Sequence, residues 1–251
     1  MRVFITGASS GLGQALARRY AAAGATLGLL GRREDALLAL RDSLPGQHRH
    51  YVVDVRERQA LHAAAADFLA AGAGRIDVVI ASAGISAGTL SEHAEDFEVF
   101  KAIVDTNLLA TVATFEPFIA AMRAQGQGRL VGIGSVAGVR GLPGAGAYSA
   151  SKAAVATYCE SLRLELGGAG IGVVTIAPGY IRTPMTAGNP YGMPFLMDAD
   201  AFALRAQAAI DRGVSYTVIP WQMGVVARLM RLLPDWLYDR AARNAPRKPR
   251  R

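Results

Sequence analysis

Short apolar segments alternate with helix-like segments along most of the chain, and this alternation is the feature that most narrows the possible folds. Arg2–Thr6 has the length and composition of a buried strand, and an alanine-rich helical pattern follows it to about Ala23. Strands connected through helices pair in parallel, and a parallel sheet is covered by helices on both faces. The sequence therefore predicts an α/β fold with a single doubly wound central parallel sheet of about seven strands. The other predicted strands are 26–30, 50–55, 76–81, 129–135, 171–177 and 215–219, and the other predicted helices are 34–43, one after Val55, 94–123 with a kink at Pro117, 148–166 and 201–212.

The composition fits one folded domain. Of the 251 residues, 51% are hydrophobic and 19% are charged, which is too apolar for a disordered chain. α/β folds often reach this length as a single unit. Because no linker or repeat interrupts the alternation, residues 1–220 are predicted to form one domain, and 221–251 an amphipathic, basic extension of that domain.

The residue inventory disfavours several kinds of site. Cys159 is the single cysteine, which excludes an internal disulfide, and its apolar helical surroundings favour a packed thiol over a nucleophile. No metal site is predicted, because none of the four histidines is spaced with acidic or cysteine partners as metal ligands are. The first strand begins at the second residue, leaving no room for a signal peptide, and no uninterrupted apolar run reaches the ~18 residues of a spanning helix. We expect a cytoplasmic protein.

The net charge of +7 is concentrated near the C-terminus. From Val226 to Arg251 there are eight Lys or Arg residues against Asp235 and Asp239, whereas the preceding 225 residues carry 19 basic and 18 acidic groups. A neutral body with a basic tail does not fit a DNA-reading fold, so no nucleic-acid partner is predicted. The tail is expected to be either a surface-binding segment or a solvated tail.

A glycine-rich turn follows the first predicted strand and opens the first predicted helix. Its glycines are Gly7, Gly11 and Gly13. Glycine lets the backbone approach a pyrophosphate closely, and a helix N-terminus presents free N–H groups to it. Glycines that serve only a tight turn are the structural alternative. The surrounding strand and helix pattern favours a dinucleotide site.

The end of the second predicted strand indicates which dinucleotide is bound. An acidic residue there holds the ribose 2′-OH of NAD, whereas an arginine accommodates the 2′-phosphate of NADP. Here the strand ends in Gly31-Arg32-Arg33, and Glu34 and Asp35 fall in the first turn of the next helix, where acids stabilise a helix N-terminus. The sequence therefore predicts NADP(H) in preference to NAD(H). Asp54, at the end of the third strand, is expected to accept a hydrogen bond from the adenine amino group, to cap the next helix, or both.

Tyr148 and Lys152 lie four residues apart on a predicted helix and so share one face. A nearby ammonium favours the phenolate and lowers the pKa of a tyrosine, so the pair can act as a proton donor. The same spacing occurs by chance on many surface helices. The neighbouring motifs decide between these two interpretations.

Taken in order, the motifs resemble the classical short-chain dehydrogenase/reductase family, through about Thr183. The family's cofactor turn, catalytic Tyr-x-x-x-Lys, catalytic serine, helix asparagine and nicotinamide-closing segment are matched by Thr6 to Gly13, Tyr148 to Lys152, Ser135, Asn107, and Pro178-Gly179 with Thr183. One motif departs from the pattern, because the family's Asn-Asn-Ala-Gly reads Ala81-Ser82-Ala83-Gly84 here. The hydrogen bonds of the first asparagine must then be met differently or lost, which bears on local rigidity more than on chemistry.

The resemblance implies a Rossmann-fold catalytic domain that transfers a hydride between NADP(H) and a carbonyl or alcohol group of a small molecule. Tyr148 would give its proton to the developing alkoxide, and Ser135 would hold the carbonyl oxygen. Lys152 would lower the pKa of the tyrosine and bind the nicotinamide ribose, while Asn107 would order a water that carries protons to Lys152. The structural alternatives are that Ser135 caps a turn and that Asn107 bonds backbone within its helix. The implied cofactor contacts are Gly7, Ser9, Ser10, Gly11, Leu12, Gly13, Arg32, Arg33, Asp54, Val55, Ala83, Gly84, Asn107, Tyr148, Lys152, Pro178, Gly179, Ile181 and Thr183.

The segment from Thr183 to Asp200 contains three prolines together with methionines and aromatic residues. It is too rich in proline for a regular element, so it is either a lid over an active site or an ordered surface loop. Pliable methionines suit an apolar ligand. We therefore expect an apolar substrate beneath a lid at about 183–200.

The last segment, 221–251, mixes tryptophans and aliphatic residues with arginines. One hypothesis is an amphipathic helix that rests on anionic lipid at the inner face of a membrane; the alternative is packing on the body or on a second subunit. The family resemblance implies a homodimer or homotetramer packed through the helices that start near Ala94 and Tyr148.

A second class of function competes with hydride transfer. A non-redox relative could use Ser135, Tyr148 and Lys152 for hydrolysis, or keep the nucleotide as a sensor or scaffold. The arginine pair at Arg32 and Arg33 favours the reductase, since a hydrolase has no use for a 2′-phosphate site.

Overall fold

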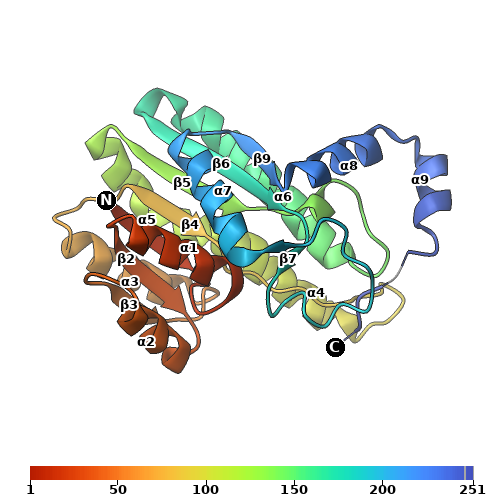
Figure 1. Cartoon of the computed structure of the whole chain (residues 1–251), viewed down its shortest axis with the longest axis horizontal. Helices are drawn as coiled ribbons and strands as arrows, with labels where there is room; N and C mark the ends of the chain where they lie inside the picture. The colour runs from red at the N-terminus through yellow and green to blue at the C-terminus, as the bar shows by residue number, and fades with distance from the viewer. Residues whose placement is uncertain (246, 251) are drawn as a thin grey trace.

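The computed structural model describes residues 1–245 and 247–250, so Pro246 and Arg251 of the predicted extension lie outside the described residues. Within the described chain, seven strands form one parallel sheet in the order β3-β2-β1-β4-β5-β6-β9 (Figure 1). This confirms the predicted doubly wound sheet. The strands are β1 (Arg2–Thr6), β2 (Thr26–Gly31), β3 (Arg49–Val52), β4 (Val78–Ala81), β5 (Gly128–Ile133), β6 (Ile171–Pro178) and β9 (Tyr216–Ile219).

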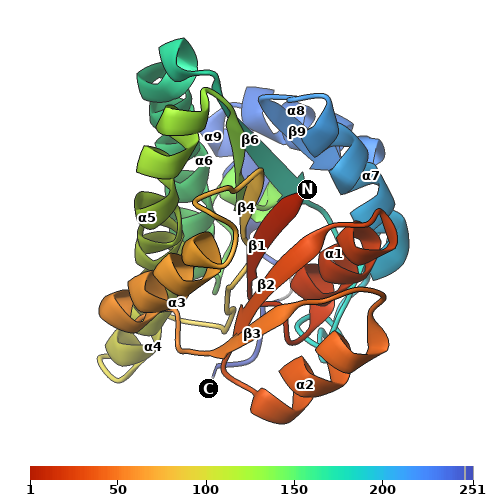
Figure 2. The same cartoon turned by 90° about the vertical axis from the view of Figure 1, so that its left-hand side faces the viewer.

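Helices cover both faces of the sheet (Figure 2). One face carries α1 (Gly11–Ala22), α2 (Glu34–Ser43) and α7 (Ala199–Asp211), and the other carries α3 (Arg58–Ala70), α4 (Asp96–Val104), α5 (Ala110–Gln125) and α6 (Gly146–Leu166). Alternate side chains of β1 point to opposite faces of the sheet and contribute to the hydrophobic core on each face. Val3 and Ile5 pack with α1 and α7 on one face, and Phe4 packs with Phe68 of α3 and Phe118 of α5 on the other. Continuous apolar strands are therefore required in this chain because both faces of each central strand are buried.

Several predicted boundaries differ from those observed. The third strand ends at Val52 instead of continuing to residue 55, and the fifth ends at Ile133, so that Ser135 lies in the turn beyond it. The predicted helix 94–123 is α4 and α5 joined by a π-helical turn, Asp105–Leu109. Pro117 lies inside α5, whereas the irregular turn contains Asn107.

The helical stretch Asp96–Gln125 is the part of the described chain that is long and apolar enough to cross a membrane. Half of its most apolar window is buried inside the fold, where α5 packs against α3 and β4. Its apolar character is therefore explained by its place under the sheet.

The chain after β9 forms α8 (Trp221–Leu232) and α9 (Asp235–Ala242), which project from one end of the molecule (Figure 1). Met223 and Ala227 are the buried residues of α8. Between β6 and α7, the two short strands β7 (Ile181–Arg182) and β8 (Met197–Asp198) enclose the proline-rich segment.

Replacing Phe118 with alanine should lower the free energy of unfolding by about 3–5 kcal/mol, because the ring is fully buried and the cavity would be lined by a rigid sheet. The Phe118 and Phe4 ring centroids lie 4.9 Å apart. Urea-induced unfolding measures the change, with Leu164→Ala as the matched control because Leu164 is 77% exposed. Equal losses in the two variants would contradict the assignment of Phe118 to the core.

Candidate active site

The candidate site lies beyond the carboxyl ends of the central strands, where the strand order reverses between β1 and β4. Ligands bind at this position in open α/β sheets. The turn after β1, the loop after β4 and the turn after β5 all end there, and the segment after β6 closes the same edge.

The glycine turn is built partly for protein packing and partly for a ligand. A Cβ atom on Gly7 would lie 2.7 Å from the Ala83 Cα atom, and one on Gly13 would clash with the Gly7 carbonyl oxygen. For Gly7 and Gly13, the close packing of a tight turn is enough to explain why the residue is glycine. Gly11 has φ +57° and meets no backbone there, since a Cβ atom would only touch the Thr183 side chain at 3.5 Å.

The N-terminus of α1 fits an anionic group. Within the described residues, Ser10 makes no side-chain capping bond and the first turn holds no acidic residue, so its N–H groups are available. A cavity of about 260 Å³ lies beside it, lined by Gly11, Thr183 and Arg18 among others. The turn therefore has the shape and the donors that a dinucleotide pyrophosphate needs.

Arg32 and Arg33 follow β2 at the edge of the sheet that carries the glycine turn. The Arg33 guanidinium donates to the Ser9 carbonyl oxygen at 2.8 Å, which brings it to the glycine turn. Arg32 is exposed, and its Nη1 atom lies 3.8 Å from an Asp54 carboxylate oxygen. Both cations are therefore presented at the outer edge of the turn.

Asp54 does not cap α3, so this alternative from the sequence is wrong. The helix N-cap is Glu57, and the Asp54 carboxylate accepts from the Arg56 backbone N–H at 3.0 Å and from its guanidinium at 2.7 Å. The Arg56 side chain holds the pKa of Asp54 below its usual range, with burial opposing it. Val55, the next residue, is buried.

Ser135, Tyr148 and Lys152 meet where the turn after β5 faces the first turns of α6. Ser135 is the N-cap of a short 3₁₀ turn, Val136–Gly138, and its Oγ atom accepts from the Ala137 N–H at 3.1 Å, so it does cap a turn. Lys152 is 5% exposed, and its Nζ atom donates to the Ile133 carbonyl oxygen at 2.8 Å. Nζ lies 5.9 Å from the Tyr148 ring centroid.

The pKa of Tyr148 is raised above its usual value in this structure, and the lowering by Lys152 stays a prediction. Burial raises the pKa of Tyr148; a hydrogen-bonding interaction with Ser135 opposes this and Tyr191 adds to it. Burial lowers the pKa of Lys152 to about 8. Tyr148 is therefore held as a protonated phenol, the state of a proton donor, and its acidity depends on Ser135 more than sequence spacing indicates.

Asn107 lies in the π turn, and its side chain connects this turn to the loop after β4 and to α6. Its Nδ2 group donates to the Ile85 carbonyl oxygen at 3.1 Å and to the Ser151 Oγ atom at 3.0 Å, and its Oδ1 atom accepts from the Ile85 N–H at 2.8 Å. Both amide hydrogens are used, so the side chain positions the loop after β4 against α6. The alternative of bonding within its own helix is wrong for the side chain; the water-ordering role stays a prediction.

The loop that departs from the family pattern is held by other residues. The Ala83 N–H donates to Thr6 Oγ1 at 3.4 Å, while the buried Ser82 Oγ atom has no hydrogen-bond partner among the described residues. A Cβ atom on Gly84 would lie 3.2 Å from Asn107 Oδ1 and 3.5 Å from Lys152 Nζ. Gly84 is therefore needed for the close approach of this loop to Lys152.

The segment 183–200 borders this site. Tyr191 lies near enough to Tyr148 to influence its pKa, and its ring meets Tyr180 edge-on at a centroid distance of 6.4 Å. Thr183 contacts the glycine turn at Gly11, as noted above. Pro178 and Ile181 are buried beside it, and Gly179 packs against Met223 of α8.

The C-terminal residues cross the mouth of the site, which the sequence did not indicate. The Arg250 guanidinium pairs with the buried Asp96 carboxylate at 2.9 Å and with Glu95 at 2.9 Å, and the Gly88 N–H donates to the Pro249 carbonyl oxygen at 3.0 Å. Lys248 Nζ donates to the carbonyl oxygen of Met185 in the proline-rich segment at 3.4 Å. A solvated tail is therefore wrong for these residues, which form a strap across the loops that flank Tyr148. A buried acid such as Asp96 needs a cationic partner, but the sequence contains 27 lysine and arginine residues and does not indicate which of them it is.

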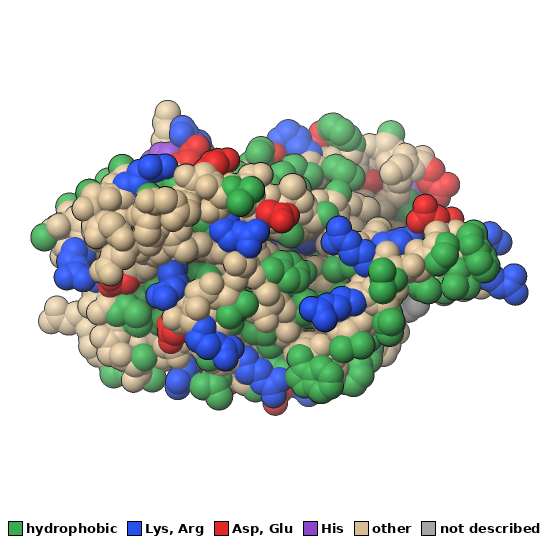
Figure 3. Space-filling view, turned by 90° about the horizontal axis from the view of Figure 1, so that it is seen from above, with side chains coloured by type: hydrophobic (Ala, Val, Ile, Leu, Met, Phe, Trp, Pro, Cys, Tyr) green, Lys and Arg blue, Asp and Glu red, His purple; other side chains and the backbone are tan. Residues whose placement is uncertain are grey.

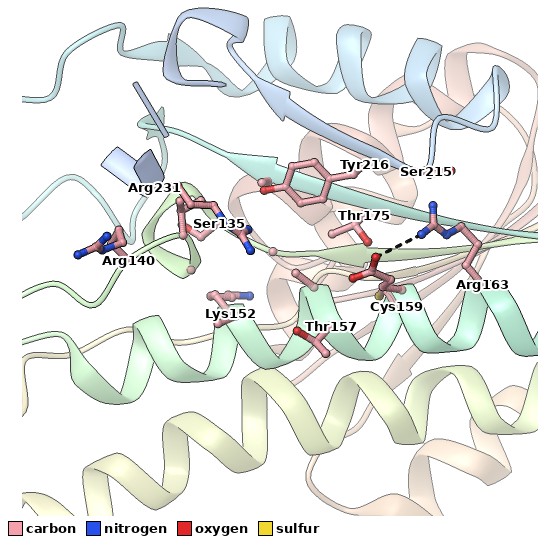
Figure 4. A pocket seen from close by; sticks show the side chains of 17 residues that line it. Ser135, Arg140, Lys152, Thr157, Cys159, Arg163, Thr175, Ser215, Tyr216 and Arg231 are labelled. Atoms are coloured by element: carbon pink, nitrogen blue, oxygen red, sulfur yellow. Dashed lines mark ion pairs between the residues drawn. The ribbon is translucent and has the colours of Figure 1, made fainter. Parts of the chain in front are cut away.

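A cavity of about 560 Å³ adjoins Ser135 and Lys152 and extends along α6 to Arg163 (Figure 4). It opens between α6, β6, β9 and α8, and no residue of the glycine turn lines it. Arg140 and Arg231 border it as well; Arg140 pairs with Asp235 at 2.9 Å and Arg163 with Glu160 at 3.7 Å. The thiol of Cys159 lies in its wall, and burial raises the pKa of Cys159 to about 11, as expected for a packed residue.

These features together define a dinucleotide-dependent oxidoreductase of the Rossmann type: the parallel sheet, the glycine turn and the Ser-Tyr-Lys cluster. A family model described as short chain dehydrogenase matches residues 1–191, and the chain belongs to the classical short-chain dehydrogenase/reductase family. An uncharacterized oxidoreductase of Myxococcus xanthus is 41% identical over 95% of each chain. A sulfoacetaldehyde reductase of Chromohalobacter salexigens is 37% identical over 73% of this chain and 74% of its own. The crystal structure of a 3-ketoacyl-ACP reductase from Sinorhizobium meliloti superposes with a TM-score of 0.81, at 27% identity, over 90% of this chain and 100% of that one.

Replacing Arg250 with alanine should release the strap, because the buried Asp96 carboxylate loses its main cationic partner. We expect faster amide hydrogen exchange in residues 85–96, where Gly88 is bonded to Pro249. The strap should also loosen as the pH falls below the ordinary pKa of aspartate, since Arg250 holds the pKa of Asp96 below that value and protonation removes the charge.

Arg243→Ala is the matched control, because Arg243 is exposed on the same segment and no ion pair of it is found in the described chain. Exchange by mass spectrometry that is unchanged in Arg250→Ala would contradict the strap.

Proposed function

We propose that this protein is an NADPH-dependent reductase of small carbonyl compounds, which run in reverse is an alcohol dehydrogenase. The observation that carries the proposal is the convergence of Ser135, Tyr148 and Lys152 beside a glycine turn with an uncapped helix N-terminus. A nicotinamide dinucleotide bound there supplies or accepts the hydride. The residues of the chain bind it, orient the substrate and move the proton.

Four residues carry the proton transfer and the positioning in this proposal. The Ser135 hydroxyl holds the substrate oxygen while Tyr148, kept protonated by burial, donates its proton as the alkoxide forms. Lys152 presents its ammonium to the nicotinamide ribose and to the phenol. Because Asn107 fixes the loop after β4 against α6, it keeps Gly84 and Lys152 at the distance the cofactor needs. Supply of protons to Lys152 through an ordered water is the further role expected of Asn107.

Selection of NADPH over NADH is supported by the two arginines at the end of β2. A phosphate accepts bidentate, charge-assisted bonds from guanidinium groups. Arg33 is already directed at the glycine turn by Ser9, and Arg32 is exposed beside it. The acids that follow, Glu34 and Asp35, lie in the first turn of α2, where they stabilise that helix.

An apolar substrate is supported by the composition of the lid at 183–200. Met185 and Phe195 are 40% and 50% exposed, and Tyr191 lies near Tyr148 with its ring edge-on to Tyr180. A hydrolytic or non-redox function is less favoured, because the arginine pair beside the glycine turn fits a 2′-phosphate that a hydrolase does not use.

We also propose a cytoplasmic homodimer or homotetramer. Phe97 and Phe100 of α4 are 66% and 36% exposed, Leu109 of the π turn is 54% exposed, and Leu164 of α6 is 77% exposed. A packed subunit would cover these side chains.

Replacing Tyr148 with phenylalanine should lower turnover by roughly 10²-fold or more and leave NADPH binding intact, because a positioned general acid is lost. NADPH loss with a ketone and aldehyde panel measures turnover, and nicotinamide fluorescence measures binding. Tyr158→Phe, ten residues along the same helix, is the control and should retain full activity. A Tyr148→Phe enzyme that reduces carbonyls at the parent rate would contradict the proposal.

Replacing Arg32 and Arg33 with alanine should weaken NADPH binding by about tenfold or more while changing NADH binding little, since only NADPH carries the 2′-phosphate. Fluorescence titration with each cofactor measures both affinities. Arg123→Ala, an exposed arginine of α5, is the control. A parent protein that binds NADH as tightly as NADPH would refute the cofactor preference.

A further inference from the structure

A stripe of large apolar side chains runs along the outer surface of α8 and continues onto α9. Trp221 is 67% exposed, Leu229 60%, Leu232 80% and Trp236 70%. With Val225, which is 47% exposed, the four residues on α8 are spaced by three or four positions and so share one side of that helix, and Trp236 follows on α9 beyond the break at Leu233 and Pro234. We call Trp221, Val225, Leu229, Leu232 and Trp236 the apolar stripe.

The stripe faces away from the rest of the protein. Met223 and Ala227, on the opposite side of α8, are 4% exposed each and pack on the body. Within the described chain α8 and α9 project from one end of the molecule (Figure 1), where hydrophobic side chains gather together with basic and a few acidic ones in the space-filling view (Figure 3). A contiguous exposed apolar face is uncommon on a monomer and marks a binding surface.

Cations flank the stripe. Arg228 lies between Val225 and Leu232 at helical spacing, and Arg240 lies one turn after Trp236. Both are exposed, as is Arg243 beyond them. Of the two acids in this segment, Asp235 is paired with Arg140. Asp239 is the other acid, so four arginines stand against two acids between Trp221 and Arg243, and the surface around the stripe carries a net positive charge.

An apolar face such as the stripe can bind either a second copy of the protein or a lipid membrane, and the charges around it favour the membrane. A symmetric contact with a second copy would bring Arg228 and Arg240 of both copies to one interface, and like charges there are unfavourable. An anionic bilayer meets the arginines with opposite charge, accepts the aliphatic side chains below its headgroups, and places tryptophan at the headgroup level.

We propose that the apolar stripe and its flanking arginines form a docking surface for an anionic lipid membrane, on which the protein rests peripherally. α8 and α9 lie in the plane of the interface, with the five apolar side chains in the lipid and the sheet on the aqueous side. The carbonyl compound that reaches the neighbouring active site can then come from the membrane, consistent with the methionine- and aromatic-rich lid.

The test is flotation of the full-length protein with vesicles of phosphatidylcholine containing phosphatidylglycerol, against vesicles of phosphatidylcholine alone. We expect flotation with the anionic vesicles and loss of it at high salt. Leu229→Gln with Leu232→Gln should abolish flotation, and Arg228→Gln with Arg240→Gln should lower the partition coefficient by about tenfold or more.

The matched control is Leu204→Gln with Arg205→Gln, an exposed apolar and basic pair on α7, which should float as the parent does. Thermal unfolding checks that each variant is folded, and light scattering measures its mass. Equal behaviour on the two kinds of vesicle, or flotation that survives the stripe substitutions, would overturn the proposal. A fall in mass on substituting the stripe would also overturn it, because the stripe would then join two copies of the chain.

Discussion

The buried ammonium of Lys152 is the interaction on which most of the site depends. An ammonium inside a protein is unfavourable unless it donates hydrogen bonds, and here it donates to the Ile133 carbonyl oxygen at the end of β5 at 2.8 Å. That bond joins α6 to the sheet and thereby fixes Tyr148, one turn earlier on the same helix. The loop after β4 must come close for Lys152 to be buried, which explains why Gly84 carries no side chain and why Asn107 clamps Ile85. Burial then lowers the pKa of Lys152 to about 8.

Much of the fold could be predicted from sequence because a parallel sheet buried on both faces leaves a periodic signature. The doubly wound sheet of seven strands with intervening helices followed from that alternation, and the bounds predicted for α2, residues 34–43, match those observed. Motif spacing also predicted that Ser135, Tyr148 and Lys152 would be neighbours. Strand ends were predicted less accurately: Val53 and Val55 have strand-like side chains, but β3 ends at Val52, and beyond the Val53 N–H bond to the Gly31 carbonyl oxygen the chain turns where Asp54 is bonded to Arg56.

Features that depend on distant partners could not be predicted. Asp96 and Arg250 are 154 positions apart, and nothing local to either indicates that they pair. The π turn at Asn107 is stabilised by Ile85 and Ser151, which belong to other elements. Spacing on a helix likewise does not indicate the burial of the Tyr148 phenol, which is the largest effect on its pKa. Residue spacing shows which side chains are neighbours on one helix, whereas the effect of burial on a pKa depends on how the whole chain folds around the group.

The C-terminal extension also contacts segments of the candidate site, through residues far away in the sequence. A Cβ atom on Gly179 would lie 2.7 Å from the Met223 side chain, so α8 packs directly behind the segment expected to meet the nicotinamide. After α9 the chain returns across the loops that flank Tyr148, where Arg250 is bonded to Asp96 and Pro249 to Gly88. The inner side of α8 therefore contacts the site while its outer side carries the apolar stripe. A molecule bound to the stripe would therefore be separated from the segment expected to meet the nicotinamide by the width of a single helix.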